Sequence, residues 1–342
     1  MWIGLVCAIA LPLLGTAQNS MLKFLGYQNK KEDKDFSREE LQVRSEADAM
    51  MGLITSWASA GVAFLIVAAV MVWLGGLSQI TELSSGFWWA VIWKAPVYAV
   101  AVWSYALAHR KGDMSLISPL LAITPAIIII IAPITIGQTA SWIGVVGIML
   151  IVVGAYLLNL FKIKDGLTAP IKELWKDHGA RFMILTATLY AFTSIIDSIG
   201  VDAAKASGNN FFFAAILWTI FINLASVLVL SPFALYFVVK LRNNRNYKDL
   251  PAVLEFIGKK SAKKMSLLGF FNGAGEVFQM IAMSFMPVAY INAIKRFSMV
   301  LGVLVGGKLF KEERWKERLL GSVVMMVGVV AVVIDWALMK GL

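Results

Sequence analysis

Residues Pro287 to Gly328 read PVAYINAIKRFSMVLGVLVGGKLFKEERWKERLLGSVVMMVG and join two apolar runs through a charged hairpin. The first run contains an adjacent pair of cations, Lys295 and Arg296. Each cation in the apolar core of a bilayer costs about 3 kcal/mol on insertion scales. We therefore expect a bound anion or a buried carboxylate to compensate this pair.

The composition is that of a membrane protein. Of 342 residues, 59% are hydrophobic and 15% are charged, and the mean hydropathy is +0.75. Soluble domains carry about 25% charged residues. Apolar runs of about twenty residues, the length that crosses a bilayer, recur along the chain. One cysteine and two histidines argue against disulfides, a cysteine metal cluster or a histidine metal site.

The apolar runs predict an all-α integral membrane fold of ten transmembrane helices. A charged loop, 27–50, follows the first helix, and Ser37 to Glu40 resembles a capping box that opens a short surface helix. A second short helix, 250–257, is amphipathic and is expected to lie on the membrane surface. The expected spans are 2–26, 51–75, 87–109, 114–137, 140–161, 181–204, 211–240, 265–286, 288–310 and 317–338.

An internal repeat divides these spans into two halves. Gly147 and Gly154 in the fifth span match Gly321 and Gly328 in the tenth, at an offset of 174 residues. The same offset aligns the fourth span with the ninth without gaps. Each half holds five helices, so the second half must enter the membrane in the opposite orientation, as in many secondary transporters. We expect a first repeat at 1–163, a basic linker at 164–180 and a second repeat at 181–342.

The distribution of cations supports this count of spans. Of the 31 Lys and Arg residues, 26 lie in the odd-numbered loops and only Lys205 and Lys340 lie on the other side. Three are inside the spans. The positive-inside rule then places the odd loops in the cytoplasm and both termini outside.

Five charged residues from four spans fall at one depth near the middle of the bilayer, counted at 1.5 Å per residue. They are three cations and two carboxylates, and neighbouring polar side chains can join them. We expect Arg296 to contact a ligand, because a guanidinium binds phosphate or carboxylate through paired hydrogen bonds. The predicted substrate-binding residues are Lys295, Arg296, Lys94, Glu276, Asp197, Asn292, Gln279, Tyr98 and Asn272.

Structural roles are open for some of these residues. Glu276 could pair with Lys295 across the hairpin between the eighth and ninth spans. Lys94 could extend to the membrane interface. Asp202 and Asp335 lie nearer the ends of their helices, where interfacial structural roles are expected.

The chain resembles the drug/metabolite transporter superfamily of the EamA type, and the resemblance covers both halves. It is carried by residues 289–328, which include Glu312 or Glu313 in the hairpin and a glycine-rich last helix. Lys295 and Arg296 also resemble the Lys-Arg pair of triose-phosphate and nucleotide-sugar translocators, which implies binding of a substrate phosphate. The family is usually drawn with both termini in the cytoplasm, whereas the cation count here indicates the reverse.

These features predict a secondary active transporter that moves a small organic metabolite, anionic or phosphorylated, by alternating access. The alternative is a proton-coupled exporter of amino acids or other neutral or cationic metabolites, in which Glu276 and Asp197 do the work. No catalytic constellation indicates an enzyme, and no cofactor or metal is expected. The expected partners are a small-molecule substrate, the lipid bilayer of the cell membrane and protons as a coupling ion, with no role for nucleic acid.

Overall fold

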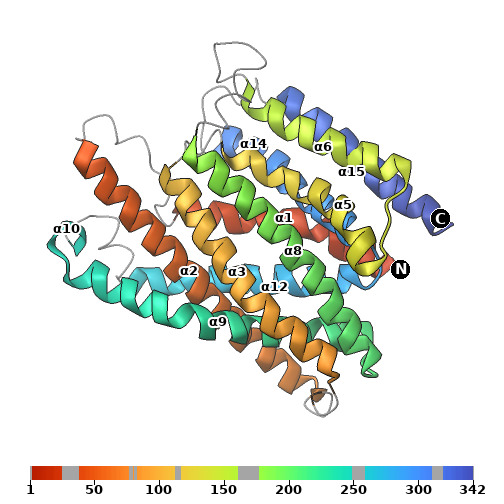
Figure 1. The fold of residues 1–342 in the computed structure, drawn as a ribbon, viewed down its shortest axis with the longest axis horizontal. Coiled ribbons are helices and arrows are strands. Elements are labelled where there is room, and N and C mark those ends of the chain that lie inside the picture. The colour runs from red at the N-terminus through yellow and green to blue at the C-terminus, as the bar shows by residue number, and fades with distance from the viewer. Residues whose placement is uncertain are drawn as a thin grey trace.

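The structure is a computed structural model that describes residues 2–24, 38–76, 80, 83–111, 117–160, 177–248, 259–309 and 319–341. Within these ranges the regular elements are all helical (Figure 1). In chain order they are α1 (Trp2–Phe24), α2 (Arg38–Trp73), α3 (Ser85–Lys111), the 3₁₀ helix η3 (Ser118–Ile123), α5 (Thr124–Ile136), α6 (Trp142–Leu160), α8 (His178–Ala206), α9 (Phe211–Asn243), α10 (Arg245–Lys248), α12 (Lys259–Met283), α13 (Val288–Lys295), α14 (Phe297–Leu309) and α15 (Leu319–Met339).

Six helical segments in the described ranges are long and apolar enough to cross a membrane. Large apolar side chains cover their outer surfaces; Trp73 and Ile134 are 84% and 85% exposed. Such a surface is stable against lipid and costly in water. The prediction of an all-α, multi-pass membrane protein is therefore confirmed. The six segments are Glu46–Trp73, Ser85–Ala108, Pro119–Ile136, His178–Ala206, Phe211–Asn243 and Leu320–Met339.

The structure corrects the prediction near the second span. Helix α2 begins at Arg38 and runs without interruption to Trp73, so the predicted short surface helix and the second span are one helix. Half of the predicted loop 27–50 is therefore helical. The register explains the continuity, because Met50, Met51 and Leu53 pack with Ala47 in one apolar cluster and extend the buried face beyond the apolar run.

Two predicted spans are each divided into two pieces. The fourth begins as η3, and α5 starts at Thr124 with Pro125 in its first turn, where the missing proline N–H disrupts no helical hydrogen bond. The ninth is divided at Arg296 into α13 and α14. There the Arg296 N–H donates to the Ala293 carbonyl at 3.1 Å, three residues back, which tightens the turn and ends the α-helical ladder.

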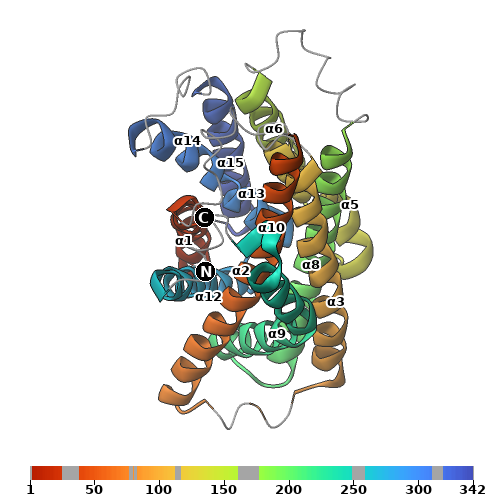
Figure 2. The ribbon, with the colours of Figure 1, turned by 90° about the vertical axis from the view of Figure 1, so that its left-hand side faces the viewer.

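Four pairs of helices form the most extensive contacts of the described chain, and the members of each pair are distant in sequence. Helix α3 packs along α8, α1 along α12, α2 along α9, and α6 along α15. Figure 1 shows α6 and α15 side by side at one edge of the bundle. Between these pairs, α13 contacts α1, α5 and α15, so it lies in the interior (Figure 2).

The α6–α15 pair is held close by the glycines that the sequence singled out. A Cβ added at Gly147 would lie 2.9 Å from the Gly328 carbonyl oxygen, and one added at Gly154 would lie 2.8 Å from the Gly321 carbonyl oxygen. The matching of 147 with 328 and of 154 with 321 shows that the two helices run antiparallel. Small residues permit this backbone contact, as they do in other membrane helix pairs.

The start of α1 and the end of α15 lie near each other in Figures 1 and 2.

Several sequence-based predictions concern other parts of the chain. The amphipathic segment 250–257, the acidic residues of the last hairpin and 11 of the 26 loop cations lie outside the described residues. The assignment of the odd loops to the cytoplasm therefore stays a prediction.

The glycine contacts predict that an added side chain destabilises the protein at Gly328 but not at Gly302. Gly328→Val should separate α6 from α15, because a Cβ there would lie 2.5 Å from the Gly147 carbonyl oxygen. We expect a loss of about 1–3 kcal/mol in stability, as in other overpacked sites, measured as a lower midpoint of thermal unfolding in detergent. The matched control is Gly302→Ala in α14, where an added Cβ meets nothing within 4 Å. Equal midpoints for both variants would contradict the close contact.

Candidate functional site

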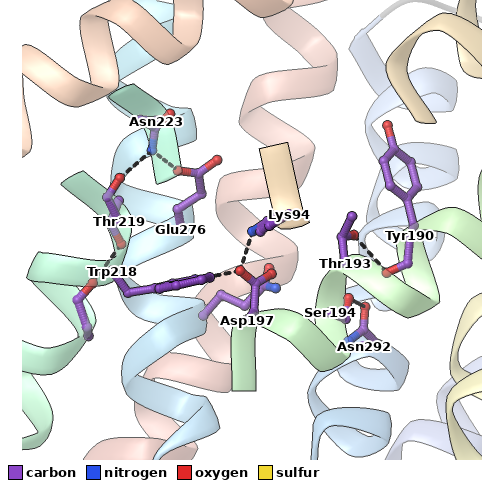
Figure 3. Close-up of polar contacts among 12 residues, drawn as sticks. Lys94, Tyr190, Thr193, Ser194, Asp197, Trp218, Thr219, Asn223, Glu276 and Asn292 are labelled. Carbon is purple, nitrogen blue, oxygen red and sulfur yellow. Dashed lines mark hydrogen bonds and ion pairs between the residues drawn. The ribbon is translucent and has the colours of Figure 1, made fainter. Parts of the chain in front are cut away.

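A buried ion pair in the interior joins α3 and α8. The Lys94 Nζ donates to the Asp197 Oδ1 in a buried ion pair, and the Trp218 indole N–H donates to the same oxygen at 2.6 Å. Figure 3 shows Lys94 and Trp218 converging on Asp197. Lys94 and Asp197 are 7% and 4% exposed, so the charges compensate each other almost without solvent. Gly200 makes room for the Trp218 ring, since any Cβ there would overlap it.

Glu276 of α12 has a different environment. Its carboxylate accepts hydrogen bonds from the side-chain amides of Asn223 in α9 and of Asn272, one turn earlier in α12, the latter at 3.2 Å. The Asn223 amide also donates to the Thr219 carbonyl at 2.9 Å (Figure 3). The Gln18 amide of α1 donates to the Asn272 side-chain oxygen at 3.2 Å. Glu276 is therefore held by neutral amide groups that link α1, α9 and α12.

The adjacent cations Lys295 and Arg296 lie where α13 ends and α14 begins. The Lys295 Nζ donates to the Gln279 side-chain oxygen at 2.8 Å. The Arg296 Nη2 donates to the Thr124 hydroxyl at 3.1 Å, which joins the two points where the fourth and ninth spans are divided. The Arg296 Nε is buried and has no hydrogen-bond partner. Neither cation forms an ion pair with a carboxylate in the described part of the chain.

These groups form one electrostatic cluster. Glu276 is within Coulombic range of Lys94, Asp197 and Lys295, and Lys295 is within range of Arg296. The Tyr98 hydroxyl is within range of both carboxylates. The hydroxyls of two further tyrosines, Tyr105 in α3 and Tyr190 in α8, are within Coulombic range of Arg296. With every group ionised the five charges sum to +1.

A separate set of hydrogen bonds fixes α13. The Tyr290 and Ser141 hydroxyls both donate to the Asp335 carboxylate, which ties α13 to α15 and to the segment before α6. The Ser194 hydroxyl of α8 donates to the Asn292 side-chain oxygen at 3.4 Å, and the Asn292 amide donates to the Val288 carbonyl at 3.0 Å. These bonds position the end of α13, where the two cations lie.

The structure replaces three structural roles that the sequence suggested. Glu276 bonds to asparagine amides and Lys295 bonds to Gln279, so the expected pair across the hairpin does not form. Lys94 pairs with Asp197 in the interior and does not extend to the interface. Asp335 is 2% exposed and fully hydrogen bonded inside the bundle. Asp202 does pair at an exposed helix end, with Lys205 at 2.6 Å.

Eight of the nine predicted residues lie in or beside the electrostatic cluster, Asn292 belongs to the separate hydrogen bonds of α13, and other residues join them. That these residues bind a substrate stays a prediction. Asn223 carried a readable signal, because an amide in the apolar run FINLASVLVL needs a partner in lipid. Trp218, Thr124 and Gln18 carried none, because tryptophan, threonine and helix-end glutamine are common in membrane helices without a polar role. Among the described residues, no group of three His, Cys, Asp or Glu side chains could hold a metal ion.

Comparisons with known proteins show a similar fold and give no information on function. No family model matches the chain, and no curated protein matches its sequence. A solved structure described as "Crystal structure of protein" is similar at a TM-score of 0.61 and 10% sequence identity. The similarity covers 85% of this chain and 92% of that chain. At this identity the similarity concerns the arrangement of helices alone.

The Lys94–Asp197 pair predicts a large cost for removing one partner. Asp197→Asn should leave the ammonium of Lys94 buried and uncompensated, which typically costs about 3–5 kcal/mol. We expect a clear fall in the thermal unfolding midpoint of the purified protein. The double variant Lys94→Met with Asp197→Leu should recover much of the loss, because both charges are then absent. The control is Asp202→Asn at the exposed pair, which should change the midpoint little. A double variant as unstable as Asp197→Asn would contradict this account.

Proposed function

We propose that the protein is a secondary transporter of a small organic anion, with Arg296 and Lys295 as the groups that bind the anionic part of the substrate. The observation that carries the proposal is the unsatisfied Arg296 guanidinium. Its Nε is buried without a partner, and its one bonded nitrogen contacts a neutral hydroxyl. Arg296 as a whole is half-buried, and a cation in apolar surroundings without a carboxylate is costly, so an anion is the simplest compensation.

The helix ends at this point also favour an anion. Helix α14 begins at Phe297, directly after Arg296, and α5 begins at Thr124, which Arg296 contacts. The start of a helix carries a partial positive charge. Here the first N–H groups already have partners, since the Thr124 N–H donates to the Leu121 carbonyl and the Met299 N–H donates to the Arg296 carbonyl. Discontinuous helices whose ends face a substrate are a common feature of transporters. Arg296 and Lys295 therefore supply the positive charge at this point, next to the starts of α5 and α14.

An inverted repeat of five helices in each half fits the helix boundaries. Helix α5 at 124–136 corresponds to α14 at 297–309, and α3 starting at 85 corresponds to α12 starting at 259. Helix α2, starting at 38, corresponds in the same way to α9, starting at 211. The division of the fourth span before Thr124 therefore recurs in the ninth before Phe297, at nearly the offset of the glycine motifs.

The contacts between helices follow the same correspondence between the two halves. An exchange of the halves maps the α3–α8 pair onto the α12–α1 pair, and it maps α2–α9 and α6–α15 onto themselves. It also maps the Gly147–Gly328 contact onto the Gly321–Gly154 contact. Trp57 donates to the Ser231 hydroxyl at 2.9 Å, and these two residues are 174 positions apart. A two-fold axis between the halves accounts for all these contacts and favours alternating access by motion of one half against the other.

The alternative function, proton-coupled export of neutral or cationic metabolites, requires free carboxylates as the substrate-binding groups. Asp197 is already occupied by Lys94 and Trp218. Glu276 is the one carboxylate of the cluster without an ion pair in the described residues. The cluster therefore offers two unpaired cations and one unpaired carboxylate, and this balance favours an anionic substrate.

Ligand-induced thermal stabilisation tests the proposal. We expect some phosphorylated sugars, nucleotide sugars or carboxylates in a panel to raise the unfolding midpoint of the purified protein. Arg296→Lys keeps the charge and loses the paired donors, so it should weaken ligand binding by about tenfold or more, at about 1.5–3 kcal/mol per charged hydrogen bond. The double variant Lys295→Gln with Arg296→Gln should abolish the stabilisation.

Lys205→Gln is the matched control, because it removes a cation at an exposed helix end. It should leave the ligand shift unchanged. Undiminished stabilisation in the double variant would contradict the proposal. Stabilisation by neutral or cationic amino acids that depends on Glu276 would favour the alternative.

A further inference from the structure

The two carboxylates of the interior cluster are compensated in different ways. Asp197 accepts from an ammonium and an indole N–H and is 4% exposed. Glu276 accepts from two side-chain amides and is only half-buried. Protonation of Asp197 would therefore leave a buried ammonium without a counter-charge, whereas protonation of Glu276 breaks no ion pair. The cluster thus contains one fixed carboxylate and one that can change its protonation state at lower cost.

We propose that Glu276 is a proton-binding site and that its occupancy is coupled to the binding of the substrate anion. Only the coupling to the substrate anion rests on the proposed function; the proton-binding site does not. Protonation of Glu276 changes the net charge of the five groups from +1 to +2. The cluster can then compensate a ligand that carries two negative charges instead of one. By thermodynamic linkage, the bound anion strengthens proton binding by the same factor by which the proton strengthens anion binding.

The groups around Glu276 determine the sign of this coupling. Lys94 of α3 and Lys295 of α13 bring positive charge within Coulombic range of the carboxylate, and Asp197 of α8 brings negative charge. Helices α1 and α9 contribute the neutral amides of Gln18 and Asn223. Helix α2 packs on α12 through Val62 and Ala63 at the glycines of that helix, and α3 adds the Tyr98 hydroxyl. An anion that binds Lys295 reduces its attraction for the carboxylate and so promotes protonation.

The hydrogen bonds also provide a path from the proton to the helices. The ionised carboxylate holds Asn223 of α9 and Asn272 of α12, and Asn272 in turn accepts from Gln18 of α1. A neutral carboxyl is a weaker acceptor and carries one donor, so these amides must rearrange on protonation. The α1–α12 contact joins the two proposed halves. Protonation therefore weakens one of the links across which the halves would move.

Carbodiimide labelling tests the proton site directly. Dicyclohexylcarbodiimide adds to protonated carboxyl groups in apolar surroundings, and peptide mass spectrometry locates the adduct. We expect labelling of Glu276 in the full-length protein at low pH and a decrease of about tenfold or more at high pH, because an ionised carboxylate carries no proton to react. Asp197 should stay unlabelled throughout.

Glu276→Gln is the matched variant, because its amide preserves the size and much of the hydrogen bonding, and its unfolding midpoint shows whether it folds. It should lose the adduct on this peptide. Labelling of Asp197 or Asp335 in place of Glu276, or labelling of Glu276 that does not vary with pH, would overturn the proposal.

The coupling is tested with the anion that gives the largest thermal shift in the panel. Its apparent affinity should rise at low pH in the native protein and be independent of pH in Glu276→Gln. A native affinity that does not change with pH would overturn the coupling. If no anion of the panel binds while Glu276 still labels in a pH-dependent way, the anion-transport proposal and its coupling fail and the proton site stands.

Discussion

The cost of placing ionised groups in an apolar bundle determines how the centre of this protein is built. The Asp197 carboxylate lies between the Lys94 ammonium and the Trp218 indole, which offsets most of that cost for two of the five charges. The ion pair ties α3 to α8, and Gly200 leaves the space that lets the indole approach. Because this pair is complete in itself, the remaining charges define what the interior can still bind. Two of them are cations and one is a carboxylate.

The arrangement of the remaining groups follows from the divided helices. If the ninth span were one continuous α-helix, the backbone N–H groups of Lys295 and Arg296 would take part in its regular hydrogen-bond pattern. The tightened turn at Arg296, which contacts Thr124, ends α13, and α14 starts at the next residue. Asp335, Tyr290 and Ser141 hold α13 from the other side. The cations therefore lie on a framework fixed by neutral and buried polar contacts, while their own charges stay available.

Much of this could be predicted from the sequence, for identifiable reasons. Hydropathy located helices long enough to cross a membrane, and the depth of Glu276, Lys295 and Asp197 in their runs predicted the proximity that the structure has. The glycine spacing in the fifth and tenth spans predicted a close helix contact, and the structure has one between α6 and α15. Hydropathy could not reveal the breaks at Thr124 and Arg296, because both halves of each divided helix are apolar. Nor could it assign partners, since Gln279, Asn223 and Lys94 each had several ionic or polar groups in reach.

The antiparallel contact of α6 and α15 has a consequence for how this chain can vary. Each helix offers a carbonyl oxygen to the glycine of the other, at Gly147 with Gly328 and at Gly154 with Gly321. The fit is reciprocal, so a methyl group introduced on either helix displaces the backbone of both. Substitution at Gly147, Gly154 or Gly328 meets backbone atoms and cannot be absorbed by a neighbouring side chain alone. At this edge of the bundle the sequence is therefore restricted to residues without a side chain, whereas in the interior it is restricted by the need to compensate charge.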